Sequence, residues 1–202
     1  MSLMIRLAYW WTPAPALARM LDRMAEVTTD ALDGLMDRYA PGDPATLIAS
    51  RGKPNGNLKA RRSAMAAAHD ARVTALVNAI GRERAIAAGR EALFAAGETL
   101  GREARARLGA GDSAADLERA ARILYRALGI HFEIEKGERG TMVMRVDRCA
   151  LAEHYSAETC EVLSAADEGV MHGLNPAMRM RFEKKMTCGH PVCLARISEE
   201  TE

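Results

Sequence analysis

The stretch IHFEIEKGERGTMVMRVD, residues 130–147, decides the fold class. Before this stretch apolar residues recur every three or four positions, which is helical spacing, whereas within it they alternate with polar residues in steps of two. A turn at 137–140 separates two such alternating runs. We therefore predict an antiparallel β-hairpin with one buried face. The apolar residues on that face are Ile130, Phe132, Ile134, Met142, Met144 and Val146.

Long helices are expected on the N-terminal side of the hairpin. Leu and Met recur at helical spacing over 14–40, and the stretch 58–128 is helical almost throughout, with breaks near Gly81 and at 109–111. Between these helical parts, 41–57 is rich in Pro, Gly and Asn, which predicts a long loop. We accordingly divide the chain into an N-terminal helical arm and linker, 1–57, and a main domain, 58–202.

After the hairpin the sequence predicts one more helix and two more strands. Ser156 is a suitable N-cap for a helix, and we expect Gly173 to lie just past the end of that helix. Extended segments are expected at about 178–187 and 192–197, joined by a turn at 188–191. The predicted fold is therefore an α+β domain: an antiparallel four-stranded sheet with helices packed mainly on one face, preceded by the helical arm.

Composition narrows the classes of partner. Of 202 residues, Lys and Arg together number 28 and Asp and Glu 27, so no overall field recruits nucleic acid or an anionic membrane. No apolar run approaches the roughly 20 residues that cross a bilayer. We expect a cytoplasmic protein that forms a homodimer through its long helices. We expect it to bind a small-molecule substrate or ligand, and we expect it to bind neither nucleic acid nor a membrane.

Cysteine usage marks the last quarter of the chain. All four cysteines lie within residues 149–193, together with three of the five histidines. Thiol, imidazole and carboxylate groups gathered in one segment indicate nucleophilic chemistry or metal ligation rather than a disulfide framework. The four cysteines are Cys149, Cys160, Cys188 and Cys193.

One face of the helix after Ser156 carries polar groups beside its core-facing stripe. At 100° per residue Cys160, Ser164 and Asp167 fall on a narrow line, where the edge of a pocket can form. The alternative is a packing face of small residues with Asp167 in solvent, and helical geometry alone favours this alternative. We expect His69 to be a surface or packed residue rather than a ligand. We expect His131 to face solvent.

The C-terminal part of the chain resembles the L-2-amino-thiazoline-4-carboxylic acid hydrolase family and, more distantly, vinyl-reductase-type small-molecule-binding domains. The resemblance covers about 100–197 loosely and 148–193 well. One departure is Ser164, which stands where the family pattern has a cysteine. The matching motif residues are Cys149 at the end of a strand, Ser164, Asp167 and Glu168 on the helix, then Gly173, Asn175 and Pro176, and finally Gly189 and Cys193.

The resemblance implies a hydrolase that opens a C–N bond of a small cyclic amidine and gives an N-carbamoyl product, with no cofactor. Attack by a cysteine thiolate is the expected chemistry, with a carboxyl group that orients or protonates the substrate and a histidine that activates the thiol. The candidate catalytic residues are Cys149, Cys193 and then Cys160 as nucleophile, Asp167 or Glu168 as the carboxyl group, and His190 or His154 as the histidine.

A vinyl-reductase-like sensor or small-molecule-binding domain is the alternative. Its cysteines would hold a structural zinc, and its pocket would take a small hydrophobic molecule. The metal ligands under this interpretation are Cys149, Cys188, Cys193 and Glu183, with Cys160 as a substitute for Glu183. A helical scaffold with incidental cysteines is a third possibility.

Overall fold

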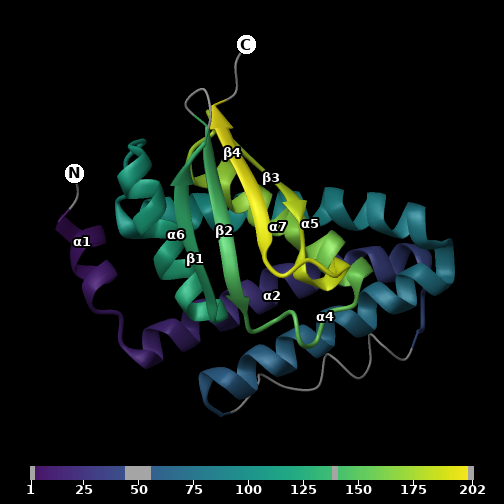
Figure 1. Cartoon of the computed structure of the whole chain (residues 1–202). Helices are drawn as coiled ribbons and strands as arrows, with labels where there is room; N and C mark the ends of the chain where they lie inside the picture. The colour runs from purple at the N-terminus through teal and green to yellow at the C-terminus, as the bar shows by residue number, and fades with distance from the viewer. Residues whose placement is uncertain (1–2, 44–55, 138–140, 200–202) are drawn as a thin grey trace.

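The computed structural model describes residues 3–43, 56–137 and 141–199. Helices come first in the chain, and a hairpin, a helix and two further strands follow (Figure 1). This order confirms the predicted α+β class. The helices are α1 (Leu3–Trp10), α2 (Ala14–Tyr39), α4 (Leu58–Ile80), α5 (Arg82–Leu108), α6 (Ala114–Leu128) and α7 (Ala157–Leu174). The strands are β1 (Ile130–Lys136), β2 (Met142–Cys149), β3 (Met178–Lys184) and β4 (Cys193–Glu199), with a short 3-10 turn, η2 (Met186–Cys188), before β4.

The four strands form one antiparallel sheet in the order β1-β2-β4-β3. The predicted hairpin is confirmed: Phe132 pairs with Val146 and Ile134 with Met144, while 138–140 of the turn lie outside the described residues. Phe132, Met144 and Val146 are buried. The alternation seen in the sequence therefore places one face of the sheet against the helices, as expected for a half-buried antiparallel sheet.

Local signals explain where the helices begin and end. The side chains of Asn57, Ser113 and Ser156 each accept a backbone N–H bond in the first turn of α4, α6 and α7. Gly81, with φ +81°, breaks the long helical stretch between α4 and α5, as the sequence predicts. Most of the predicted loop, 44–55, lies outside the described residues.

Glycines bring α5 and α7 into backbone contact. A Cβ atom on Gly97 would lie 2.0 Å from the carbonyl oxygen of Ala166, and one on Gly169 would lie 2.1 Å from that of Phe94. The prediction that Gly173 lies just past the end of α7 is wrong, because the helix continues to Leu174. Gly173 serves this contact instead: a Cβ there would lie 2.2 Å from the carbonyl oxygen of Glu98. The pairing fixes α7, and with it one wall of the cavity described below.

The N-terminal arm packs on the main helices. The arm residues Leu21, Met24 and Leu32 are buried, and a fully buried guanidinium, Arg72 of α4, pairs with Asp33 of α2 at 2.6 Å. In Figure 1 the sheet lies in front of α7 and α5, and α2 and α4 cross below them. Helix α2 also lines the cavity described below, through Met20, Met24 and Thr28.

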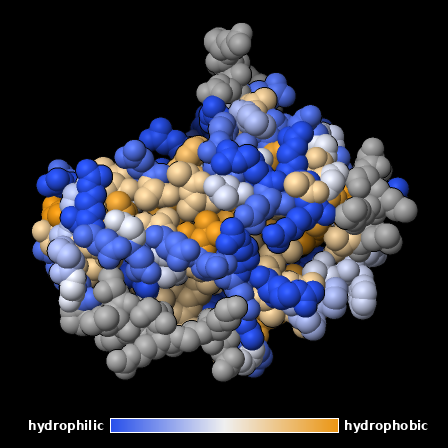
Figure 2. Space-filling model, turned by 180° about the vertical axis from the view of Figure 1, so that it is seen from behind, coloured by the Kyte–Doolittle hydropathy of each residue, from blue (hydrophilic) through white to orange (hydrophobic). Residues whose placement is uncertain are grey.

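The face seen from behind carries hydrophobic residues in a band bordered by hydrophilic ones (Figure 2). None of the described helices is long and apolar enough to cross a membrane. A homodimer formed through the long helices stays a prediction.

Candidate active-site cavity

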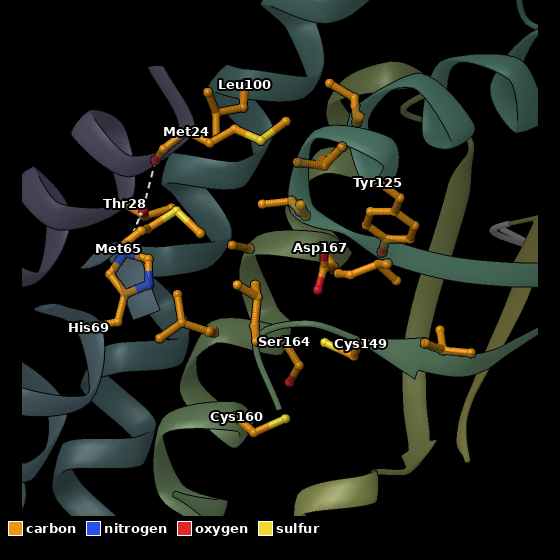
Figure 3. A pocket seen from close by; sticks show the side chains of 18 of the residues that line it. Met24, Thr28, Met65, His69, Leu100, Tyr125, Cys149, Cys160, Ser164 and Asp167 are labelled. Atoms are coloured by element: carbon orange, nitrogen blue, oxygen red, sulfur yellow. Dashed lines mark hydrogen bonds between the residues drawn. The ribbon is translucent and has the colours of Figure 1, made fainter. Parts of the chain in front are cut away.

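A cavity of about 180 Å³ lies between the buried face of the sheet and the helices. Helices α2, α4, α5, α6 and α7 all contribute to it, together with strand β2 and the segment after β3. Its wall is mostly apolar, and a few polar groups converge on it (Figure 3). Apolar lining residues include Met24, Met65, Leu100, Leu124, Val146 and Phe182.

Asp167 is the carboxyl group of the cavity. It projects from α7, keeps part of its surface accessible, and hydrogen-bonds the hydroxyl of Tyr125, which is buried on α6 (Figure 3). Burial in apolar surroundings raises the pKa of Asp167 from 3.8 to about 7, and the neighbouring charge of Glu168 adds to the rise, while the Tyr125 hydroxyl opposes it. The expectation that Asp167 is solvated on a packing face is therefore wrong, because the sheet and α6 enclose it.

Three of the four thiols line the same cavity: Cys149 at the end of β2, Cys160 on α7 and Cys193 at the start of β4. Burial raises the pKa of Cys149 and of Cys160 to about 11 and also raises that of Cys193, and the charge of Asp167 adds to the rise in each case. At neutral pH these side chains are therefore thiols rather than thiolates.

The opposite wall holds a buried histidine. His69 of α4 is 2% exposed and lies beside Thr28 of α2 (Figure 3). Its ring nitrogens lie 2.9 Å from the Thr28 hydroxyl and 2.8 Å from the Tyr155 hydroxyl. Burial lowers the pKa of His69 to about 3, and the charge of Arg72 lowers it further, so the ring is neutral at pH 7. His69 is thus a packed residue, one of the two outcomes that the sequence predicts, and it also faces the cavity.

Positive charges lie at the cavity wall. Lys185, which is 7% exposed, pairs with Glu161, and Arg23 pairs with Glu103 at 2.8 Å. Arg107 also reaches Glu103, at 3.5 Å. All three cations line the cavity. The carboxylates neutralise these three cations in part. Each cation keeps further N–H donors that can bind an anion.

The remaining predicted site residues lie elsewhere. Glu168 faces away from the cavity and accepts a hydrogen bond from Arg90 at 2.7 Å. A second, polar hollow of about 260 Å³ is lined by Glu168, Glu183, Cys188 and His190. His154 is exposed, and His131 pairs with Asp147 at the surface. The structure thus brings together Cys149, Cys160, Cys193 and Asp167, and it separates Glu168 and His190 from them.

The four predicted zinc ligands are not gathered into one site. Cys149 lines the apolar cavity, whereas Cys188 and Glu183 line the polar hollow, and Glu183 is engaged with Arg196 at 2.7 Å. Over 3–43, 56–137 and 141–199, no three His, Cys, Asp or Glu side chains come together in a way that could hold a metal ion.

Sequence analysis missed Tyr125, Tyr155, Thr28 and Lys185 as cavity residues. Tyr125 and Thr28 lie within helical stretches where their spacing suits an ordinary core position, and their partners come from distant segments. Lys185 precedes the predicted turn among other basic residues, so nothing in the local pattern marks it as buried. These contacts depend on tertiary packing, which local periodicity does not report.

A family model described as L-2-amino-thiazoline-4-carboxylic acid hydrolase matches residues 61–197, well over half of the chain. The chain belongs to this family. The matched segment of this thiazoline-carboxylate hydrolase family member contains Asp167, Tyr125 and the three cavity cysteines, whereas α2 with Thr28 lies before it. No curated protein sequence matches the chain.

Solved structures of similar shape come from other proteins. A trafficking protein particle complex subunit 3 from Naegleria fowleri, covalently bound to palmitic acid, is 15% identical, with a TM-score of 0.54 over 71% of this chain and 97% of that one. An H-NOX protein from S. oneidensis in the Fe(II)NO state is 12% identical, with a TM-score of 0.47 over 89% of this chain and 99% of that one. The first likeness shows a shared fold.

Proposed function

We propose that the protein is a hydrolase that opens a small cyclic amidine of the thiazoline-carboxylate kind. Family membership supports the reaction class. The observation that carries the proposal is Asp167, a carboxyl group in an apolar cavity whose pKa of about 7 lets it both accept and donate a proton near neutral pH. Tyr125, through its hydrogen bond, holds this carboxyl group in position.

The atoms of the reaction balance as follows. In a 2-amino-thiazoline ring the amidine carbon is bonded to the ring sulfur, the ring nitrogen and the amino nitrogen. Water adds its oxygen to this carbon, and one water proton ends on the ring nitrogen. The carbon–sulfur bond then breaks, and the other proton goes to the sulfur. An N-carbamoyl product therefore requires cleavage of the C–S bond, which corrects the expectation that a C–N bond opens.

We propose water rather than a thiol as the nucleophile. With a pKa of about 11, Cys149 and Cys160 are ionised in only about one molecule in ten thousand at pH 7. Asp167 as a carboxylate takes the proton from the attacking water and then returns it to the departing sulfur. Under this proposal the thiols form part of the apolar wall. Ser164, which stands where the family pattern has a cysteine, therefore does not remove the nucleophile.

The charged groups of the wall supply the substrate carboxylate with partners. Lys185 and Arg107 line the same cavity as Asp167. Each keeps N–H donors beyond those engaged by Glu161 and Glu103. The apolar wall around the buried Lys185 strengthens such a contact relative to water, whereas solvent screens contacts of the exposed Arg107. Lys185 pairs with Glu161 near the start of α7, whereas Arg107 lies near its end, because the neighbouring Arg105 donates to the carbonyl oxygen of Leu174. The cavity thus offers a cation at either end of α7 for the carboxylate and an acid–base group for the ring.

The test is incubation with 2-amino-thiazoline-4-carboxylate, with the product identified by mass spectrometry and by its new thiol. We expect a product heavier than the substrate by one water, and we expect four single Cys→Ser variants to keep turnover within about threefold of wild type, because no thiol forms a bond to the substrate. Loss of turnover in Cys149→Ser or Cys193→Ser, with the fold retained by circular dichroism, would overturn the assignment of water as nucleophile.

Binding of an apolar ligand is the second candidate function, because most of the cavity wall is apolar. The similarly folded trafficking subunit is described as covalently bound to palmitic acid, which makes palmitate a suitable probe. Saturable palmitate binding that is lost on widening the wall with Met24→Ala, together with no hydrolysis of the thiazoline, would favour this function. Turnover without palmitate binding would exclude it.

A further inference from the structure

A basic groove lies on the opposite side of β2 from the polar hollow, between α1, the start of α4, the end of α6 and the start of β1. It has a volume of about 600 Å³, within the range of small-molecule sites. Five Arg and Lys side chains line it, against one carboxylate, Glu153. The balance of charge over the whole chain therefore hides a strongly positive local surface. The five cations are Lys59, Arg62, Arg122, Arg126 and Arg148.

Most of these cations have no acidic partner. Arg122 pairs with Glu118 at 2.8 Å and stacks on the ring of Phe132. Within the described part of the chain, no carboxylate pairs with Lys59, Arg62, Arg126 or Arg148. His131, which also lines the groove, is engaged by Asp147. Unpaired like charges held close together repel one another, so an anion in the groove would stabilise the fold.

Arg62 is held in place as a part of this groove. Its Nε and Nη2 donate to the carbonyl oxygens of Ala127 and Arg126 at 2.7 and 2.8 Å, which leaves donors on Nη1. Gly129 makes room for it, because a Cβ atom there would lie 2.9 Å from Nη1. Burial without an acidic partner lowers the pKa of Arg62. A fixed, partly desolvated guanidinium is well suited to bind an oxyanion.

We propose that this groove binds the phosphate group of a ligand, with Arg62, Lys59 and Arg148 as its principal contacts. Phosphate oxygens accept several charge-assisted hydrogen bonds at once, and Arg presents a planar fork of donors that matches them. The phosphate belongs either to a soluble phosphate ester or to a lipid headgroup. Trp10 and Trp11, the two tryptophans of the chain, are 82% and 76% exposed, and the adjacent Tyr9 lines the groove.

The two sources are told apart by these tryptophans. Indole rings partition into the interface of a bilayer, and nearby basic residues are attracted to anionic lipids. A lipid headgroup therefore brings Trp10 and Trp11 into contact with the membrane and shifts their fluorescence to the blue. A soluble phosphate ester fills the groove and leaves both rings in water. The shared chemistry, phosphate on Arg62, Lys59 and Arg148, is the same in both cases.

The test titrates the full chain with inorganic pyrophosphate by calorimetry, and with vesicles of phosphatidylglycerol and phosphatidylcholine by tryptophan fluorescence. We expect saturable binding that weakens with added salt and that falls at least about tenfold in the Lys59→Gln, Arg148→Gln double variant, because charge-assisted bonds to both are lost. Both side chains are exposed, so the variant keeps the fold. Lys136→Gln, Lys184→Gln is the matched control, since it removes two exposed lysines outside the groove.

Either source supports the proposal if the groove variant loses binding and the control variant does not. Pyrophosphate binding without vesicle binding identifies a soluble ester. Vesicle binding with a blue shift that Trp10→Ser, Trp11→Ser abolishes identifies a headgroup. Failure of both probes to bind, or an equal loss of binding in the control variant, would overturn the proposal.

Discussion

Asp167→Asn should change how the stability of the fold depends on pH. In the folded state the pKa of Asp167 is about 7 against 3.8 in the unfolded chain, so between these values the folded state holds the extra proton and stability falls as pH rises. A rise from 3.8 to about 7 corresponds to about 4 kcal/mol at 1.36 kcal/mol for each pH unit, and contact with water in the cavity lowers the measured value.

His69 acts in the opposite direction. Its pKa is about 3 in the folded state against 6.5 in the unfolded chain, so between these values the unfolded state holds the extra proton and stability rises with pH. The nominal size is about 5 kcal/mol. In the wild type the two slopes largely cancel between pH 4 and 6.5. Without Asp167 the rising slope of His69 is no longer offset.

The assay is urea denaturation followed by circular dichroism at pH 4, 6 and 8. The free energy of unfolding of Asp167→Asn, relative to wild type, should rise by about 2 to 4 kcal/mol from pH 4 to pH 8. Asn keeps an acceptor for the Tyr125 hydroxyl, so the contact survives. Tyr125→Phe removes the bond that lowers the pKa of Asp167, so the stability of this variant should fall more between pH 4 and pH 8 than that of the wild type. A difference between Asp167→Asn and wild type that stays constant within about 1 kcal/mol over this range would refute a raised pKa at Asp167.

Three further predictions concern the rest of the molecule. Gly169→Ala should destabilise the fold by about 2 kcal/mol or more, because the new Cβ would meet the Phe94 carbonyl oxygen. Gly34→Ala is the control: nothing lies within 4 Å of its Cβ, so it should stabilise α2 by up to about 1 kcal/mol, and urea titration measures both changes. Asp33→Asn should cost about 3 kcal/mol, since it leaves the buried Arg72 without its charged partner, whereas Asp22→Asn, which breaks the more exposed pair with Arg61, should cost less than about 1 kcal/mol. With Ellman's reagent the exposed Cys188 should react first in the native protein, and the half-buried Cys149 and Cys160 and the buried Cys193, whose pKa values burial raises, should react more slowly; equal rates for all four would contradict the burial described here.

The fold was more predictable than the site, for a physical reason. Alternation over 130–147 and the cap at Ser156 are local signals, and they correctly predict the hairpin strands and the start of α7. The sequence mispredicts the end of α7 because Gly173 resembles a C-cap, whereas its role is to let Glu98 of α5, 75 residues earlier in the chain, come close.

For the site, helical spacing correctly places Cys160, Ser164 and Asp167 on one line, since that depends on a single helix. Whether this line faces solvent or a cavity depends on α6 and the sheet, which local pattern does not reveal. Adjacent positions on α7 likewise point to different places: Asp167 faces the cavity and Glu168 faces Arg90. The sequence resemblance names both carboxyl groups, and only the packing of α7 separates them.

The most direct test of the proposed acid–base role is the kcat/KM for 2-amino-thiazoline-4-carboxylate of wild type, Asp167→Asn and Asp116→Asn between pH 5 and 9. Asp116 is a buried carboxyl group, 3% exposed, at the start of α6 and outside the cavity, so it controls for loss of a buried charge. We expect the wild-type rate to rise with pH to a plateau above about 7, Asp116→Asn to keep this profile, and Asp167→Asn to lose at least about a hundredfold with no such rise. An Asp167→Asn variant that keeps the rate and the pH profile of the wild type would contradict the account.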